Sequence, residues 1–129
     1  MVKELKELLK KSYAPWSKFH VAAIAVDAKG NKYSGVNVEN AAFPSGLCAE
    51  RCALFSSVAQ GAIVGDIKEI HIISSGEEII SPCAGCRQVM TEFMKNDALV
   101  YQYNNEGDKM RINKIIELVP FPIRGEQIK

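Results

Sequence analysis

Four cysteines stand in two short clusters, and their spacing is the feature of the sequence that points most directly to chemistry. Cys83 and Cys86 form a Cys-x-x-Cys unit, while Cys48 and Cys52 lie earlier in the chain. In a reducing compartment, clustered cysteines indicate metal ligands or catalytic thiols before they indicate disulfides. Three thiolates can hold Zn²⁺ and leave its fourth coordination position free for water. The pattern therefore favours a catalytic zinc site formed by Cys48, Cys83 and Cys86.

Charged side chains beside these cysteines suit such a site. Glu50 follows Cys48 by two residues, too near in sequence to share the metal but well placed to face a bound water. Arg51 and Arg87 each adjoin a ligand, and an arginine that hydrogen-bonds to thiolate sulfur offsets the negative charge of a three-thiolate centre. The alternative for both arginines is an ordinary surface position on an amphipathic helix. That alternative weighs more for Arg87 than for Arg51.

Cys52 leaves two interpretations open. As a fourth ligand it would close the site into a structural four-cysteine zinc centre. On a helix, however, it lies one turn beyond Cys48 and deeper in the core, where a free cysteine behaves as a small hydrophobic residue. We favour the buried interpretation. A thiol oxidoreductase that uses Cys83 and Cys86 is a weaker alternative, because the Cys-x-x-Cys unit is common to redox and zinc sites.

Hydrophobic periodicity and turn signals predict the elements that must position these residues. The two helices that carry the cysteines each follow a strand and begin at Cys48 and at Cys83, where the helix dipole favours thiolates. The expected order is α-β-β-α-β-α-β-β-α, which indicates an α/β fold with a mixed sheet. The elements are a helix ending before Ala14-Pro15, strands over 19–26 and 32–38, a helix over 48–60, a strand over 69–74, a helix over 83–94, strands over 98–103 and 110–112, and a short helix over 113–118.

Length and composition limit the remaining possibilities. The 129 residues, 47% of them hydrophobic and 24% charged, suit a single globular domain over 1–129. Sixteen basic and fifteen acidic residues give a net charge of +1, which argues against a nucleic-acid binder or a polybasic membrane anchor. The longest apolar run, 21–26, is too short to span a membrane, and lysines and glutamates interrupt any signal-peptide core at the start. We therefore expect a cytoplasmic protein.

Five segments carry a family pattern: 13–19, Asn37-Val38-Glu39-Asn40, Cys48-Ala49-Glu50, Ser81-Pro82-Cys83-Ala84-Gly85-Cys86-Arg87-Gln88 and Glu117-Leu118-Val119-Pro120. With these segments, the chain from about Tyr13 to Ile128 closely resembles the small, homotetrameric cytidine deaminases. The resemblance implies a three-layer α/β fold in which helices cover both faces of a mixed five-stranded sheet. It also implies one Zn²⁺ per chain and hydrolytic deamination of cytidine and 2′-deoxycytidine to uridine and 2′-deoxyuridine, with release of ammonia, in pyrimidine salvage.

The resemblance also implies a role for each matching position. Glu50 moves protons between the attacking water, ring N3 and the departing amine, as general acid–base catalysis requires. By spacing alone Phe19 would belong to the core, and a lone strand histidine such as His20 or His71 is usually structural. The implied zinc ligands are Cys48, Cys83 and Cys86, with Arg51 beside them; the implied substrate contacts are Phe19 stacking on the pyrimidine, Asn37 and Glu39 on the ribose hydroxyls, the Ala49 N–H on the base carbonyl and the Ser81 carbonyl on the exocyclic amine.

The chain departs from the family pattern at three positions. Ala22 replaces a usual glycine, and Phe43 stands where tyrosine is frequent. Ile123 aligns with the aromatic residue that a neighbouring subunit lends to the site, and Phe121 is the other candidate for that ring. Two rival functions remain. The first is a deaminase of another cytosine aminonucleoside, which Glu39 disfavours because it suits a ribose diol. The second is a non-catalytic zinc module, which the presence of Glu50 disfavours.

Overall fold

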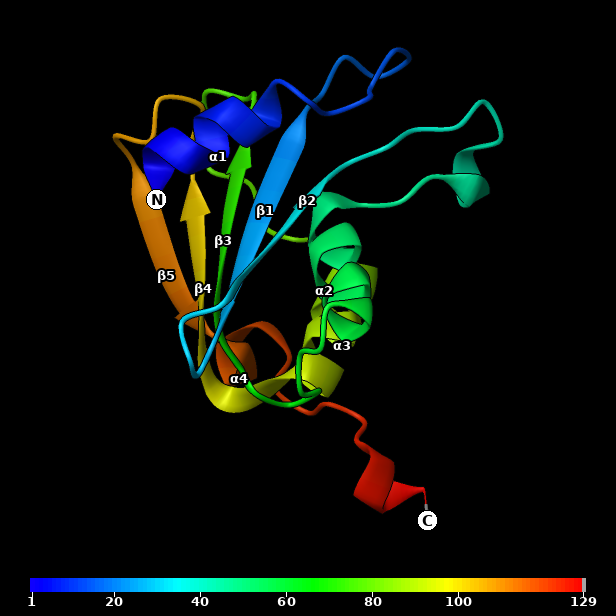
Figure 1. Ribbon diagram of the computed structural model, residues 1–129, viewed down its shortest axis with the longest axis vertical. Helices are drawn as coiled ribbons and strands as arrows, with labels where there is room; N and C mark the ends of the chain where they lie inside the picture. Colours follow the sequence, from blue (N-terminus) through cyan, green and yellow to red (C-terminus); the bar gives the residue numbers. More distant parts are fainter. Residues whose placement is uncertain (129) are drawn as a thin grey trace.

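A five-stranded mixed sheet of order β2-β1-β3-β4-β5 lies at the centre of the computed structural model, which describes residues 1–128 (Figure 1). Only β3 and β4 run parallel; every other neighbouring pair is antiparallel. The elements are α1 Val2–Leu9, β1 Val21–Asp27, β2 Lys32–Val36, the 3₁₀ helix η1 Phe43–Ser45, α2 Ala49–Ala59, β3 Ile67–Ser74, α3 Ala84–Phe93, β4 Met94–Tyr103, β5 Met110–Lys114, α4 Ile115–Leu118 and the 3₁₀ helix η2 Gly125–Gln127.

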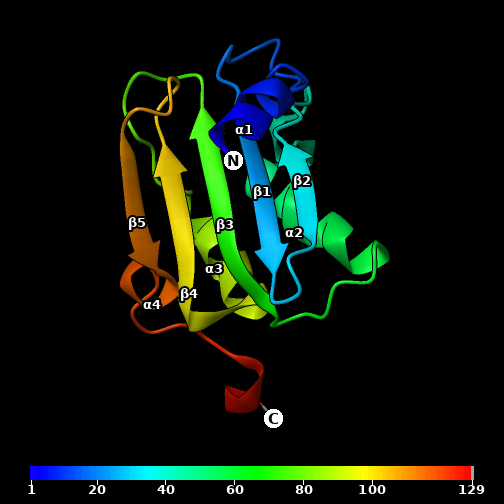
Figure 2. The same cartoon turned by 60° about the vertical axis from the view of Figure 1, so that its left-hand side comes forward.

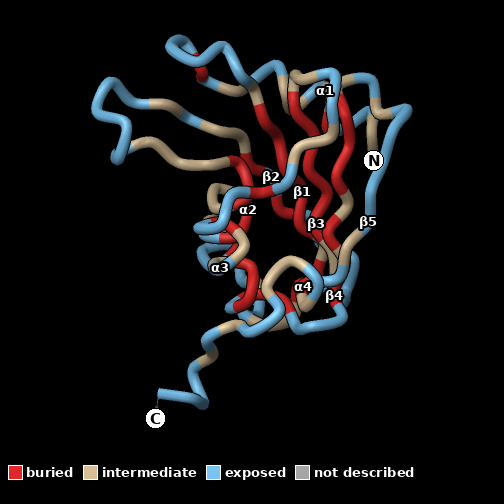
Figure 3. The backbone as a smooth tube through the Cα atoms, turned by 180° about the vertical axis from the view of Figure 1, so that it is seen from behind, coloured by how far each residue is buried: buried red, intermediate tan, exposed pale blue. Residues whose placement is uncertain are grey.

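Helices cover both faces of the sheet, as the sequence predicted. Figure 2 shows α1 on one face, with α2 and α3 behind the other. Leu5 of α1 packs on Ile73 of β3, whereas Ile72 of the same strand joins the core cluster that contains Leu54 of α2 and Met90 of α3. Each fully buried side chain of this size contributes about 1.5–3 kcal/mol relative to an exposed one. The buried positions run along the central strands, while the η1 loop and the C-terminal tail are largely exposed (Figure 3).

Close contact between α2 and β2 depends on Gly35. A Cβ atom at this position would lie 2.3 Å from the Ala53 nitrogen and 2.5 Å from the Ala49 oxygen. No side chain fits at such distances, so glycine allows the backbone of α2 to rest directly on the edge strand. This contact fixes the position of the first turn of α2 relative to the sheet, and that turn carries Glu50.

The predicted element order is confirmed, and the differences lie at element ends. β4 begins at Met94, directly after α3, rather than at Ala98. The polar residues 95–97 conceal this start because they are exposed and lack the alternation that indicates a strand. Among residues 1–128, no helix is long and apolar enough to cross a membrane.

The carboxylate of Asp27 organises the β1–β2 turn and should make stability depend on pH. Burial raises its pKa, but hydrogen bonds from the Asn31 side chain and N–H, the Tyr33 hydroxyl and the Lys29 N–H outweigh burial and lower the pKa below the ordinary 3.8. A lowered native pKa stabilises the fold above the unfolded value, and this contribution disappears as the pH falls through the native value. Asp27→Asn should therefore unfold at a lower temperature than the wild type at about pH 7, with a gap that shrinks towards about pH 3. A gap that stays constant over this range, measured by thermal unfolding, would contradict this role.

Candidate active site

The sulfur atoms of Cys48, Cys83 and Cys86 converge where α2 and α3 begin, and all lie within 4.8 Å of one another. Cys48 is the N-cap of α2 and Cys83 the N-cap of α3, and both have extended backbone angles. Cys86 lies on the first turn of α3 and is fully buried. The unpaired N–H groups at both helix starts favour negative sulfur. The predicted convergence of these three cysteines into one metal site is confirmed.

The close approach of the three sulfurs perturbs Cys48 and Cys86 in opposite directions. Hydrogen bonding with Cys86 and Cys83 lowers the pKa of Cys48 to about 6. The same contact with Cys48, together with burial, raises the pKa of Cys86. The thiolate form of Cys48 is thus favoured by the hydrogen bonds that it accepts from its neighbours. A divalent cation held by Cys48, Cys83 and Cys86 would displace their thiol protons, so that all three could bind as thiolates, a ligand type that zinc accepts.

Arg51 lies against this sulfur group. Its Nε donates to Cys86 Sγ at 3.4 Å and its Nη2 donates to Cys83 Sγ at 3.8 Å. These bonds raise the pKa of Arg51 further above its ordinary value. Gly85 makes room for the guanidinium, because a Cβ there would lie 2.4 Å from Arg51 Nη2. The arrangement places one fixed positive charge beside three sulfurs, which reduces the net negative charge of a zinc–thiolate centre.

Arg87 and Cys52 lie outside the sulfur group. Arg87 donates to the Pro82 carbonyl at 2.8 Å and to the Leu118 carbonyl at 3.4 Å, so it ties α3 to the end of α4. Cys52 is half-buried rather than deep in the core, because its face of α2 rests on the edge strand beside Gly35. The metal-binding group contains the other three cysteines and not Cys52.

Glu50 is a buried carboxyl group beside the sulfurs. It lies on the first turn of α2 with 5% of its surface exposed. Burial raises the pKa of Glu50, and the negative charge of Cys48 raises it further. A carboxyl with a raised pKa is suited to accept a proton and return it during a reaction. It faces a cavity of about 190 Å³, lined by Val21, Asn37, Cys48, Ala49, Glu50, Ile80, Ser81 and Cys83.

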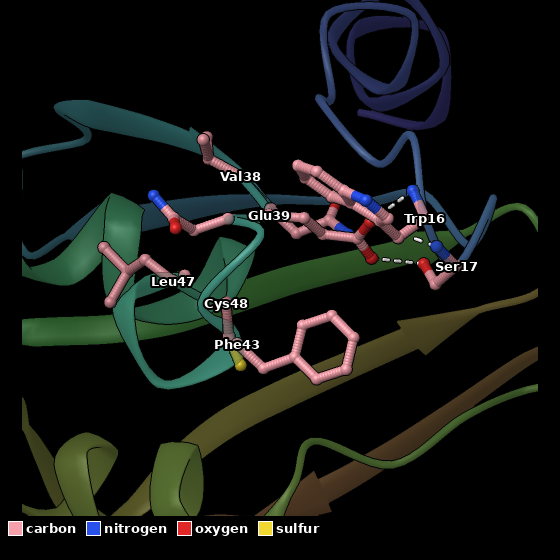
Figure 4. A pocket seen from close by; sticks show the side chains of 10 residues that line it. Trp16, Ser17, Val38, Glu39, Phe43, Leu47 and Cys48 are labelled. Carbon is pink, nitrogen blue, oxygen red and sulfur yellow. Dashed lines mark hydrogen bonds between the residues drawn. The ribbon is translucent and has the colours of Figure 1, made fainter.

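A larger cavity of about 450 Å³ adjoins this one, and the two share Asn37 and Cys48 as lining residues. Figure 4 shows Glu39, Trp16 and Phe43 around it. Glu39 Oε1 accepts hydrogen bonds from the backbone N–H groups of Trp16 and Ser17, each at 3.1 Å, and its other oxygen accepts from the Ser17 hydroxyl. The Ser17 hydrogen bond lowers the pKa of Glu39, which keeps this group a carboxylate.

Of the expected substrate contacts, Asn37, Ala49 and Ser81 line the small cavity, whereas Phe19 lies outside its lining. Phe19 precedes β1, and its ring lies against Gly76 with 36% of the residue exposed. The expectation from spacing alone, that Phe19 belongs to the core, is therefore wrong, because strand β1 begins only at Val21. Ser81 lines the small cavity, and its hydroxyl accepts a hydrogen bond from Arg111 at 2.8 Å. Ala49, another lining residue, is fully buried.

The two histidines differ in their relation to the site. His71 is buried between the Tyr103 hydroxyl at 2.8 Å and the Glu69 carboxylate at 3.0 Å, which is the structural role expected of a strand histidine. His20 instead contacts Ser12, which contacts Asn37. Neither the spacing of Ser12 nor that of His20 in the sequence indicates this contact, since their hydrogen bonds form only after β1 and β2 pair.

The three-layer fold, with three cysteine sulfurs at two helix starts and a buried carboxyl beside them, is the arrangement of a zinc-dependent hydrolytic enzyme. Residues 1–102 match the family described as the cytidine and deoxycytidylate deaminase zinc-binding region. The chain is 38% identical to a cytidine deaminase of Sporosarcina psychrophila, over 99% of this chain and 92% of that one. It is 34% identical to a cytidine deaminase of Halalkalibacterium halodurans, over 99% and 95%.

A solved structure of a cytidine deaminase shows the same fold as this chain. A crystal structure of cytidine deaminase from Burkholderia pseudomallei superposes with a TM-score of 0.88 and 38% identity, covering 95% of each chain. The mixed five-stranded sheet and its helical layers are thus those of the cytidine deaminase fold. The chain belongs to the cytidine and deoxycytidylate deaminase family.

Proposed function

We propose that this enzyme hydrolyses the exocyclic amine of cytidine and 2′-deoxycytidine, giving uridine or 2′-deoxyuridine and ammonia. The observation that carries the proposal is the position of Glu50, a buried carboxyl that lines the same small cavity as Cys48 and Cys83. The names of the full-length relatives support the choice of a cytosine nucleoside. Release of ammonia from cytidine by zinc-loaded protein tests it, and no release from either nucleoside would refute it.

The residues of this chain divide the chemistry between them. Zinc, if held by Cys48, Cys83 and Cys86, would act as a Lewis acid and lower the pKa of the attacking water. Glu50 accepts a proton from that water and delivers it to ring N3, which makes C4 open to attack. Glu50 then takes the remaining proton from the new C4 hydroxyl and passes it to the exocyclic amine, which leaves as ammonia when the C4–N4 bond breaks. The Ala49 N–H holds the base carbonyl and the Ser81 carbonyl holds the amine, so the ring lies with C4 towards Glu50.

The rival functions fit the site less well. A structural zinc module would use all four cysteines, whereas the metal-binding group contains three. A thiol oxidoreductase gives no role to Glu50. The larger cavity beside Asn37 and Glu39 provides hydrogen-bonding groups of the kind a sugar diol needs, which favours a ribose or deoxyribose nucleoside over the free base.

Asn37 and Glu39 should bind the sugar and not the base. Asn37→Ala or Glu39→Gln should raise KM for cytidine by roughly 5- to 150-fold, because an unpaired buried polar partner costs about 1–3 kcal/mol. Free cytosine has no hydroxyls, so its weaker turnover should change little. Steady-state kinetics with both compounds measures the difference, and equal losses for nucleoside and free base would show that these residues act elsewhere.

The C-terminal tail supports a homotetramer whose active sites lie near subunit boundaries. Figure 1 shows the tail leaving the sheet at the end away from the η1 loop. It is held against α3 by a Gln88 hydrogen bond to the Ile123 carbonyl and by Arg124, which donates to the Thr91 carbonyl. Phe121 is 96% exposed, and contact with another chain would remove its apolar ring from water. A ring held outwards in this way suits a neighbouring subunit.

Mixed oligomers test the tail. Light scattering of the active species should give a multiple of the 14.2 kDa chain mass, in keeping with four chains. Glu50→Gln protein mixed with a chain truncated before Phe121 should regain activity that neither has alone, because each supplies what the other lacks. A monomeric active species would refute the tetramer, and no recovery despite proven subunit exchange would place the tail's function within its own subunit.

The cellular setting follows from the chemistry. Thiolate ligands must stay reduced to hold zinc, which favours the cytoplasm over an oxidising compartment. The reaction returns a cytosine nucleoside to the uracil pool, and so we place the enzyme in pyrimidine salvage.

A further inference from the structure

Two backbone groups fix the orientation of the Asn37 carboxamide. Its Oδ1 accepts a hydrogen bond from the Val21 N–H at 2.8 Å, and its Nδ2 donates to the Phe19 carbonyl at 2.8 Å. A backbone N–H only donates and a backbone carbonyl only accepts, so the oxygen and the nitrogen of this amide cannot be exchanged. Within residues 1–128 the second Nδ2–H has no hydrogen-bond partner, and Asn37 lines both cavities.

Two further side chains, those of Ser12 and His20, are linked to Asn37 Oδ1 by consecutive hydrogen bonds. Ser12 Oγ is hydrogen-bonded to Asn37 Oδ1 and lies 2.9 Å from His20 Nδ1. Because Oδ1 carries no proton, the Ser12 hydroxyl must donate to it. That hydroxyl has a single proton, and therefore His20 Nδ1 must supply the proton of the second bond. The donors run in one direction, from His20 through Ser12 to Asn37.

We propose that Ser12 and His20 are positioning residues for nucleoside binding, which act by filling the second lone pair of Asn37 Oδ1. The proposal rests on the proposed function, in which Asn37 binds a sugar hydroxyl. Donation into Oδ1 holds the carboxamide rigidly and draws electron density from Nδ2, so the free Nδ2–H becomes a stronger donor. That N–H is the group left to meet a sugar hydroxyl oxygen.

Backbone hydrogen bonds bring both donors to this place. The Tyr13 N–H donates to the Asn37 carbonyl at 3.1 Å, and the Glu39 N–H donates to the Tyr13 carbonyl at 2.8 Å, which sets Ser12 beside the strand end. His20 is fixed by its N–H to the Ser75 hydroxyl at 3.0 Å and by the Ser75 N–H to its carbonyl at 2.9 Å. The donors are thus held in position before substrate arrives, which lowers the entropy cost of binding.

Steady-state kinetics with cytidine tests the proposal. Ser12→Ala and His20→Ala should each raise KM by roughly 3- to 10-fold, the effect of one lost hydrogen bond, while kcat changes less than about twofold. His20→Asn should restore KM, because its amide N–H can replace the Nδ1–H as donor. Ser34→Ala, which removes an exposed hydroxyl on β2, is the matched control and should leave both constants unchanged. Unchanged KM in folded Ser12→Ala would refute the proposal.

A double-mutant cycle shows whether the effect passes through Asn37. Adding Ser12→Ala to Asn37→Ala should cause no further rise in KM. An additive rise would mean that Ser12 acts by another route, and it would refute the relay, that is, the hydrogen-bond chain from His20 through Ser12 to Asn37. If His20→Ala fails to fold, Ser12→Ala and His20→Asn still complete the test.

A spectroscopic measurement separates failure of the relay from failure of the proposed function. The Nδ2 protons of Asn37, identified by their loss in Asn37→Ala, should shift upfield in ¹H–¹⁵N spectra of Ser12→Ala. Wild-type protein that leaves cytidine unchanged would refute the proposed function alone. Asn37 amide shifts identical in wild type and Ser12→Ala would refute the relay alone.

Discussion

Glu50→Gln should abolish deamination and leave zinc bound. Glutamine keeps the shape of the side chain but can neither accept the proton of the attacking water nor return it to the base. One general acid–base group contributes about 10²–10⁴-fold in rate, and Glu50 is proposed to serve several proton transfers, so the loss should reach or exceed the upper value. The measurement is kcat together with the zinc content of the same sample.

The controls separate a lost proton carrier from a damaged fold. Glu50 is buried with a raised pKa, so removal of its charge should leave the unfolding temperature unchanged or higher. Glu92→Gln removes an exposed carboxyl from α3 and should keep full activity. Glu50→Gln protein that keeps most of its activity would contradict the assigned role of Glu50.

Removal of a metal ligand should cost both zinc and stability. Cys48→Ala, Cys83→Ala and Cys86→Ala should each fall well below one zinc per chain and lose activity in proportion. Metal binding is coupled to folding, so the three variants should also unfold at lower temperatures than zinc-loaded wild type. Atomic absorption and thermal unfolding measure the two losses.

Cys52→Ala is the matched control, since it removes a thiol from the same helix as Cys48. Its sulfur lies outside the metal-binding group, so the variant should keep one zinc per chain and most of its activity. Zinc loss in Cys52→Ala equal to that of the other three variants would indicate a closed four-cysteine site instead.

The sequence predicts the parts of the site that local patterns determine. Helix starts at Cys48 and after Pro82 are encoded within a few residues. The two helices begin at the same edge because β2 and β3, the strands that precede them, are both antiparallel to β1 and so point the same way. The meeting of Cys48, Cys83 and Cys86 follows from that geometry. The buried position of β3 likewise follows from its apolar run.

Contacts between distant segments are not predictable in this way. Phe19 looks like a core residue, because nothing nearby shows that β1 begins only at Val21. The hydrogen bonds of Ser12 and His20 join residues that become neighbours only when the segment after α1 pairs with the end of β2. Such bonds depend on strand register, which one sequence specifies through its whole core rather than through a motif.

The most direct test of the central claim is the conversion of cytidine by zinc-loaded wild-type protein, with ultraviolet absorbance and released ammonia followed in the same reaction. The account predicts that cytidine is replaced by uridine with one ammonia per uridine, and that Glu50→Gln protein carrying the same zinc produces neither. The account would be contradicted if zinc-loaded wild-type protein left cytidine and 2′-deoxycytidine unchanged. It would also be contradicted if the Glu50→Gln variant formed uridine as fast as the wild type.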